Sequence, residues 1–260
     1  MADQLLRRRS RQAGCFIYGL LLLGGLITSF ASPAAAQFWL PARAPDPIVS
    51  QPLSRPPEGA TVRREKTGTA FFVDGTGAML TARHAVEDCL RIVVAKEGRV
   101  ASARVVALSS RFDIALIKVP KTMGIAAVFP RNVTASANDL VFVAAYDKLP
   151  ETVSRGGTFA NATVTSGFGG GEAGYLAIDS NVTFGASGAP VLDSRGLVEG
   201  VISRRTMVNR VLAVGADEAK KFLAGNGIRF EEDDRPQIAG SASRANRAAS
   251  ISARVTCLQN

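Results

Sequence analysis

The chain has 260 residues, enough for one good-sized domain or two small ones. Hydrophobic residues make up 47% and charged residues 20% of it, as in an ordinary soluble globular protein, and the glycine and β-branched content leans toward β structure. The formal net charge of +9 suggests an anionic partner, but the positive charge is scattered, aromatic side chains are few and no nucleic-acid motif is present. A nucleic-acid partner is therefore not expected.

Residues 1–36 have the pattern of an export signal peptide. An arginine-rich stretch precedes an apolar run from Cys15 to about Phe30, and Ala34 and Ala36 then supply the A-x-A arrangement that signal peptidase accepts. We expect cleavage after Ala36 and a periplasmic or secreted protein. The alternative is an uncleaved anchor in the membrane, for which an apolar run of about sixteen residues is slightly short.

Residues 37–66 contain repeated prolines, which prevent regular helix and predict an extended linker. A β domain is expected over 67–225, because short apolar runs there alternate with glycine and polar turns. The runs divide near 123–139 into two halves of similar strand number, as in two small barrels packed together. The expected strands are Thr69–Val73, Ala78–Ala82, Arg91–Ala95, Val100–Leu108, Ile114–Val119, Leu140–Ala145, Thr158–Thr165, Tyr175–Asp179, Pro190–Leu192, Leu197–Ser203 and Arg210–Val214.

The first clear helix is expected late, over Ala216–Ala224, where apolar residues recur with helical spacing and Gly225 offers a stop. Beyond Phe230 the chain becomes acidic and then rich in serine, alanine and arginine. Such a segment has too little apolar surface to offset the entropy of ordering. Residues 226–260 are therefore expected to form a largely disordered tail.

Two cysteines, Cys89 and Cys257, remain once the signal peptide is removed. An even pair in an exported chain permits one disulfide, which would tie the region just after His84 to the C-terminal end. The alternative is a buried Cys89 and a free thiol in the tail. One histidine and two cysteines offer no zinc-ligand spacing, so neither a metal nor another cofactor is expected.

Three motifs that carry chemistry follow one another along the chain. His84 comes directly after an apolar strand, Asp113 opens another, and Ser187 lies in the turn sequence Gly-Ala-Ser-Gly-Ala-Pro. Each motif alone is common in structural roles, but together they supply the parts that acyl transfer needs. A serine hydroxyl needs an adjacent base to become nucleophilic, and His84 is the one histidine in the chain.

A carboxylate from Asp113 would fix the tautomer of His84 and stabilise the imidazolium formed during attack. The turn around Ser187 can supply backbone N–H donors to the reacting centre. Gly185 lacks a Cβ and can adopt the φ that turns its N–H toward the reacting centre. The N–H groups of Gly185 and Ser187 are therefore the expected oxyanion hole.

The three motifs, in the order His, Asp, Ser, resemble those of the trypsin-like (chymotrypsin-fold) serine peptidases. The separations of 29 residues between His84 and Asp113 and 74 between Asp113 and Ser187 resemble the compact bacterial HtrA-type subgroup. The resemblance runs from about Gly68 to Leu223. It implies an all-β fold of two six-stranded antiparallel β-barrels with a short C-terminal helix, and a catalytic triad of His84, Asp113 and Ser187 in the cleft between the barrels.

The chain departs from these families in two places. Ala186 stands where digestive enzymes have an aspartate that pairs with a newly cut N-terminus, and where HtrA-type proteins commonly have asparagine. Activation by insertion of a new N-terminus is therefore not expected. The second departure concerns the PDZ domain that usually follows the protease in HtrA proteins, because the 35 residues after Gly225 are too few for one.

The substrate pocket implied by the resemblance suits a small or medium apolar side chain. A strong preference for arginine or lysine is not expected, because Asn181 stands where trypsin has aspartate. The residues expected to line the pocket are Ile178, Asn181, Thr183, Ile202 and Ser203.

Two hypotheses for the function follow. The first is an exported serine endopeptidase that hydrolyses peptide bonds in protein or peptide substrates through an acyl-enzyme intermediate. The alternative is a catalytically inactive protease-fold protein that acts as a binding or scaffold module. The presence of all three triad residues favours the first hypothesis, since decayed relatives usually lose at least one.

Overall fold

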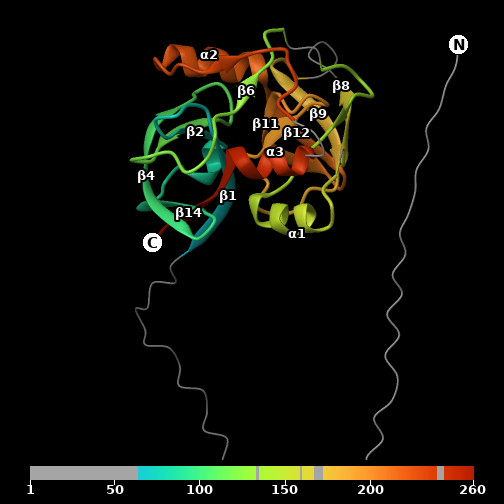
Figure 1. The fold of residues 1–260 in the computed structure, drawn as a ribbon. Helices are drawn as coiled ribbons and strands as arrows, with labels where there is room; N and C mark the ends of the chain where they lie inside the picture. Colours follow the sequence, from blue (N-terminus) through green and yellow to red (C-terminus); the bar gives the residue numbers. More distant parts are fainter. Residues whose placement is uncertain (1–63, 133–134, 159, 167–171, 239–242) are drawn as a thin grey trace, which may run out of the picture. The chain divides into compact units, whose positions relative to one another are not determined.

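The computed structural model describes residues 64–132, 135–158, 160–166, 172–238 and 243–260. The expected signal peptide at 1–36 and nearly all of the expected linker at 37–66 lie outside the described residues. β-Strands are the main regular structure of the described chain, and they form a closed six-stranded barrel and a second six-stranded sheet (Figure 1). Both are antiparallel, so the predicted fold of two six-stranded antiparallel barrels is confirmed.

Barrel one has the strand order β1-β14-β3-β4-β5-β2. Burial alternates along β3, where Ile92 and Val94 point inward and are buried while Val93 and Ala95 are more exposed. The two inward-pointing side chains join Phe72, Met79 and Ile117 in the barrel interior. The strands of barrel one are β1 (Glu65–Phe72), β2 (Ala78–Thr81), β3 (Arg91–Lys96), β4 (Arg99–Leu108), β5 (Ala115–Lys118) and β14 (Ser252–Leu258).

The sixth strand of barrel one comes from the C-terminal end of the chain. β14 lies between β1 and β3 and pairs antiparallel with both. The expectation of a largely disordered tail over 226–260 is therefore wrong for residues 243–260. The reason is that Ala253, Val255 and Cys257 all point into the barrel and are fully buried, which a low-complexity composition conceals.

Two further features fix this C-terminal segment in place. α3 (Arg244–Ile251) precedes β14, and the side chain of Ser243 caps the N-terminal end of the helix by accepting a hydrogen bond from the N–H of Asn246. A disulfide then joins Cys89 to Cys257, so the pairing is formed and the tail thiol is not free. Upstream, the two-residue strand β13 (Glu231–Glu232) pairs in parallel with β6 (Val128–Phe129).

The second sheet has the order β10-β11-β12-β9-β8-β7. Its two edges meet where Phe142, just after β7, exchanges backbone hydrogen bonds of 2.9 Å in both directions with Leu192 of β10. We call this closed sheet barrel two. Its strands are β7 (Leu140–Val141), β8 (Ala162–Ser166), β9 (Tyr175–Ser180), β10 (Pro190–Leu192), β11 (Val198–Met207) and β12 (Arg210–Gly215).

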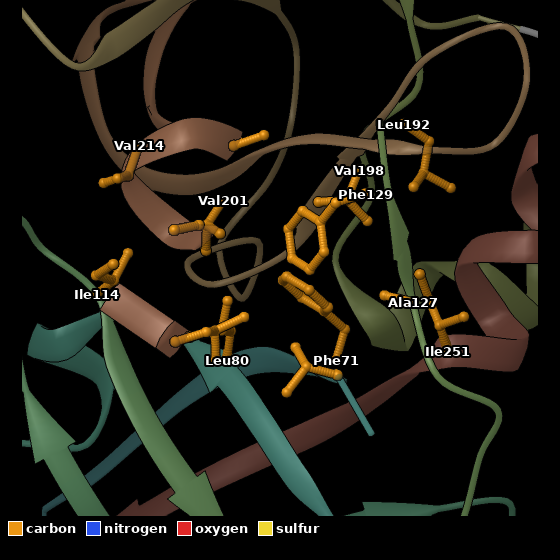
Figure 2. Close-up of a cluster of buried hydrophobic side chains, with 14 of the residues drawn as sticks. Phe71, Leu80, Ile114, Ala127, Phe129, Leu192, Val198, Val201, Val214 and Ile251 are labelled. Carbon is orange, nitrogen blue, oxygen red and sulfur yellow. The ribbon is translucent and has the colours of Figure 1, made fainter. Parts of the chain in front are cut away.

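A shared hydrophobic cluster holds the two barrels together. Figure 2 shows Phe71 and Leu80 of barrel one against Phe129, with Val198 and Val201 of barrel two on the other side. All five side chains are fully buried. Burial of this kind stabilises a domain by roughly 25 cal/mol per Å² of apolar surface. The cluster therefore fixes the orientation of one barrel against the other, and with it the boundary where the candidate site lies.

Helices are short in the described chain. α1 (Leu149–Ser154) and the 3-10 helix η2 (Tyr146–Lys148) precede β8, while α2 (Ala216–Gly225) follows β12 and matches the helix expected at Ala216–Ala224. None of the helices in the described ranges is long and apolar enough to cross a membrane.

Candidate active site

Three side chains predicted from the sequence to act together lie side by side. His84 is in η1 (Arg83–Ala85), a 3-10 helix that follows β2 almost at once. Asp113 lies in the turn between β4 and β5, and Ser187 in the loop between β9 and β10. Barrel one thus supplies the imidazole and the carboxylate, and barrel two supplies the hydroxyl.

Hydrogen bonds connect the three side chains in a chain. The Nδ1 of His84 lies 2.8 Å from Oδ2 of Asp113, and Nε2 of His84 lies 3.0 Å from Oγ of Ser187. The backbone N–H of His84 also donates to Oδ1 of Asp113 at 3.0 Å. With a carboxylate on Nδ1, the proton of a neutral imidazole is held there, and Nε2 is left to accept from the serine hydroxyl.

The pKa shifts follow from this contact. The hydrogen bond with Asp113 raises the pKa of His84 above its usual value, against an opposing effect of burial. Burial by itself would raise the pKa of Asp113, but hydrogen bonds from the His84 side chain, from Ser203 and from the His84 backbone outweigh it and leave that pKa lowered. The site therefore favours a charged carboxylate and an imidazole that readily takes a proton.

Ser203 has a role here that the sequence did not indicate. Its hydroxyl donates to Oδ2 of Asp113 at 2.7 Å, on the oxygen that also faces His84 Nδ1. From the sequence, Ser203 was expected only in the substrate pocket. It lies on β11, and its position opposite Asp113 depends on how the barrels pack, for which no local motif exists.

The loop before Ser187 presents two backbone donors. Gly185 has a φ of +87°, a left-handed conformation that favours glycine. The N–H groups of Gly185 and Ser187 make no hydrogen bond to any residue in the described part of the chain. N–H groups without a partner on the loop that carries a serine hydroxyl form an arrangement that can bind a developing oxyanion.

A buried threonine anchors this loop to barrel one. The hydroxyl of Thr69 donates to the carbonyl of Gly185 at 2.7 Å and accepts from the N–H of Tyr146 at 2.9 Å. The N–H of Thr69 donates to the carbonyl of Ser187 at 2.9 Å. At Gly188, φ is +84° and a Cβ would lie 2.2 Å from the carbonyl oxygen of Thr69. This close approach requires glycine at position 188.

A cleft with a cavity of about 500 Å³ lies beside the three side chains. Its walls combine buried apolar side chains with exposed polar and basic ones. The residues that line it are Lys66, Thr67, His84, Ala85, Val182, Thr183, Phe184, Gly185, Ala186, Ser187, Ile202, Ser203, Arg204, Arg205 and Val211.

Of the five residues expected to line the pocket, Thr183, Ile202 and Ser203 do so. Ile178 does not: it is fully buried in the interior of barrel two, because the alternation along β9 points it inward. Asn181 is exposed and faces two other cavities, so it does not line the cleft either.

Several residues that line the cleft were not predicted from the sequence. Val182 and Val211 form part of its apolar wall, and Phe184 stands fully exposed at its edge. Lys66 and Arg205 bring positive charge to it. Within the described ranges, no group of three or more His, Cys, Asp or Glu side chains is arranged to hold a metal ion.

The chain has a chymotrypsin-like fold of two antiparallel six-stranded barrels. A serine, a histidine and an aspartate are hydrogen-bonded to one another where the two barrels meet. The family model described as "Trypsin-like peptidase domain" matches residues 68–201. The chain therefore belongs to the trypsin-like peptidase family.

Curated relatives, two of them serine proteases by name, are similar to this chain over part of their own length. Serine protease HTRA1 of Xenopus tropicalis is 27% identical over 61% of this chain and 35% of its own length. The serine endoprotease DegS of Salmonella typhimurium is 29% identical over 52% of this chain and 38% of its own length. The uncharacterized protein y4bJ of Sinorhizobium fredii is 29% identical over 84% of this chain and 36% of its own length. The chain thus spans about a third of the length of these curated relatives.

Among solved structures, the serine endoprotease from Yersinia pestis superposes with a TM-score of 0.51 at 21% sequence identity. The match covers 61% of this chain and 57% of that chain. At this identity the likeness supports the fold alone.

Proposed function

We propose that the protein is an exported serine endopeptidase that cleaves protein or peptide substrates through an acyl-enzyme intermediate. The observation that carries this proposal is the continuous hydrogen-bond chain from Ser187 through His84 to Asp113, with distances of 3.0 and 2.8 Å. Membership of the trypsin-like peptidase family supports the same reaction class.

In the proposed reaction, Oγ of Ser187 attacks the carbonyl carbon of the scissile bond while Nε2 of His84 takes the hydroxyl proton. The carbonyl oxygen becomes an oxyanion, bound by the N–H groups of Gly185 and Ser187. The C–N bond then breaks, and His84 gives its proton to the leaving amine. A water molecule attacks the acyl-enzyme in the same way, with His84 again accepting and returning a proton.

Asp113 acts through His84 in this proposal. Its carboxylate stabilises the imidazolium formed in both halves of the reaction, and Ser203 holds that carboxylate in place through its 2.7 Å hydrogen bond. Removing one donor from an oxyanion hole typically costs about 10²–10³ in rate. Ala186 is nearly fully buried and has no carboxylate to pair with an inserted N-terminus. We therefore propose that the site needs no activation of that kind.

Labelling with a fluorophosphonate probe tests the proposal directly, because such probes react with a serine only when it is activated. We expect one labelled serine in the mature protein, identified as Ser187 by peptide mapping, together with cleavage of unfolded casein. Ser187→Ala should abolish both signals. Ser194→Ala is the matched control, since Ser194 is exposed and lies outside the cleft, and should leave both unchanged.

The competing function is a binding or scaffold module without catalysis. It requires that wild-type protein, folded by circular dichroism, neither reacts with the probe nor cleaves casein. That result would overturn the endopeptidase proposal.

Export is proposed from the N-terminal sequence alone. Mass spectrometry of the N-terminus after expression in a bacterium should find Gln37 as the first residue. Recovery of residues 1–36 in a membrane fraction would instead favour the uncleaved anchor.

A further inference from the structure

The cavity beside Ser187 has apolar walls. Val182, Ile202 and Val211 line it, and they are 9%, 3% and 2% exposed. In the proposed reaction, the side chain of the residue whose carbonyl Ser187 attacks must enter a cavity that adjoins Ser187. The methylene groups of that side chain would pack against these walls.

The charged side chains that line this cavity are basic. They are Lys66, Arg204 and Arg205, and the lining includes no Asp or Glu. Arg204 is already neutralised, because it forms an ion pair with Glu172 at 3.1 Å. The cavity therefore presents a net positive charge to whatever side chain enters it.

Arg205 differs from Arg204 in having no carboxylate partner among the described residues. Its Nη2 donates to the carbonyl oxygen of Val182, so the guanidinium is held against the wall of the cavity. This contact uses one of the five N–H donors of a guanidinium, and the others make no hydrogen bond to the part of the chain that the structure describes. A guanidinium remains charged at any physiological pH and pairs well with a carboxylate.

We infer that the cleft selects substrates with Glu or Asp at the residue whose carbonyl is attacked, and that Arg205 pairs with that carboxylate. This inference rests on the proposed endopeptidase function and names its substrate class. It departs from the apolar preference expected from the sequence, because the cavity is lined by a cation, Arg205, that has no carboxylate partner among the described residues. Lys66 adds a second positive charge to the same cavity.

Four quenched fluorescent peptides that differ only at this residue, with Glu, Gln, Val or Lys, provide the test. We expect kcat/KM for the Glu peptide to exceed that for the isosteric Gln peptide by roughly tenfold, the value of one charge-assisted hydrogen bond. Because the interaction is between charges, the ratio should fall as NaCl is raised from about 0.05 to about 0.5 M.

Two variants locate the effect. Arg205→Gln should bring the Glu-to-Gln ratio close to one. Arg210→Gln should keep the wild-type ratio, because Arg210 lies on the same hairpin of β11 and β12 but outside the cavity lining. If Arg205→Gln no longer reacts with the fluorophosphonate probe, Arg205→Lys takes its place. That variant keeps the charge and should keep a preference for Glu.

Labelling of Ser187 separates the ways in which the inference can fail. Wild-type protein that is labelled, yet cleaves the Val or Lys peptide as fast as the Glu peptide, overturns the inference and leaves the proposed function standing. A Glu-to-Gln ratio that does not change with salt, or that survives in a labelled Arg205→Gln variant, also overturns it. Wild-type protein that is neither labelled nor active on any peptide overturns both.

Discussion

Loss of the Cys89–Cys257 disulfide should destabilise the protein by an amount that follows from the length of the loop it closes. The two cysteines are 168 residues apart in sequence. For such a loop the chain-entropy relation gives about 5 kcal/mol, and removal of native disulfides typically costs about 2–5 kcal/mol. A domain of this kind has a free energy of unfolding of about 5–15 kcal/mol. The double variant Cys89→Ser/Cys257→Ser should therefore melt roughly 5 to 20 °C below wild type.

The position of the disulfide predicts that activity is lost along with stability. Cys257 lies on β14, which closes barrel one, and Cys89 follows the 3-10 helix that carries His84. The hydrogen bond from the N–H of Leu90 to the carbonyl of Leu258, at 2.9 Å, joins the same two segments. As β14 detaches, the segment that holds His84 loses its support, and cleavage of casein should stop in the same temperature range as unfolding.

Thermal unfolding followed by circular dichroism, with and without dithiothreitol, is the assay. The reductant should lower the Tm of wild type to that of the double variant and leave the double variant unchanged. Equal shifts in both proteins would show that the reductant acts elsewhere. A double variant that melts within about 2 °C of oxidised wild type would refute the argument from loop closure.

The remaining predictions concern single residues. Asp113→Asn should reduce kcat/KM by about 10⁴. In wild type, kcat/KM should rise with pH, because His84 must be neutral to act as a base. The midpoint of that rise should lie above the ordinary histidine pKa, because the hydrogen bond with Asp113 raises the pKa of His84. Burial raises the pKa of Glu199 from 4.5 to about 7. Between these two pH values the native state binds more protons than the unfolded state, so the free energy of unfolding falls as the pH rises. Glu199→Gln should therefore increase the free energy of unfolding by about 1–3 kcal/mol at pH 8 and have little effect near pH 4, measured by urea denaturation at both pH values. Gly188→Ala should abolish casein cleavage and lower the free energy of unfolding by about 3 kcal/mol or more, because the added Cβ would lie 2.2 Å from the carbonyl oxygen of Thr69. A variant with wild-type activity and stability would contradict this close approach of the two backbones.

The sequence predicted the meeting of His84, Asp113 and Ser187 because each belongs to a local motif. Short-range patterns of strand, turn and glycine place each side chain at the end of an element, and the family resemblance then brings the ends together. The same reasoning predicted the two-barrel fold, because the strands of both barrels show apolar runs separated by turns.

Other parts depend on contacts between distant segments and left no local signal. β14 was hidden in a segment whose composition is typical of disorder, and its partners β1 and β3 lie far away in sequence. Ile178 was misplaced because strand position alone does not say which face of β9 lines the cleft. The charge that Arg205 brings to the cleft depends on its contact with Val182, which joins strand β11 to the loop between β9 and β10.

The place of β14 in barrel one has a consequence for how the chain is made. A ribosome delivers β1 to β5 first, but the barrel they form has a gap between β1 and β3 that only β14 fills. His84 and Asp113 both belong to that barrel, while Ser187 lies in the other. The nascent chain would therefore carry all three side chains long before the scaffold that aligns them can close. Closure of the barrel that carries His84 and Asp113 therefore requires that β14 has been synthesised.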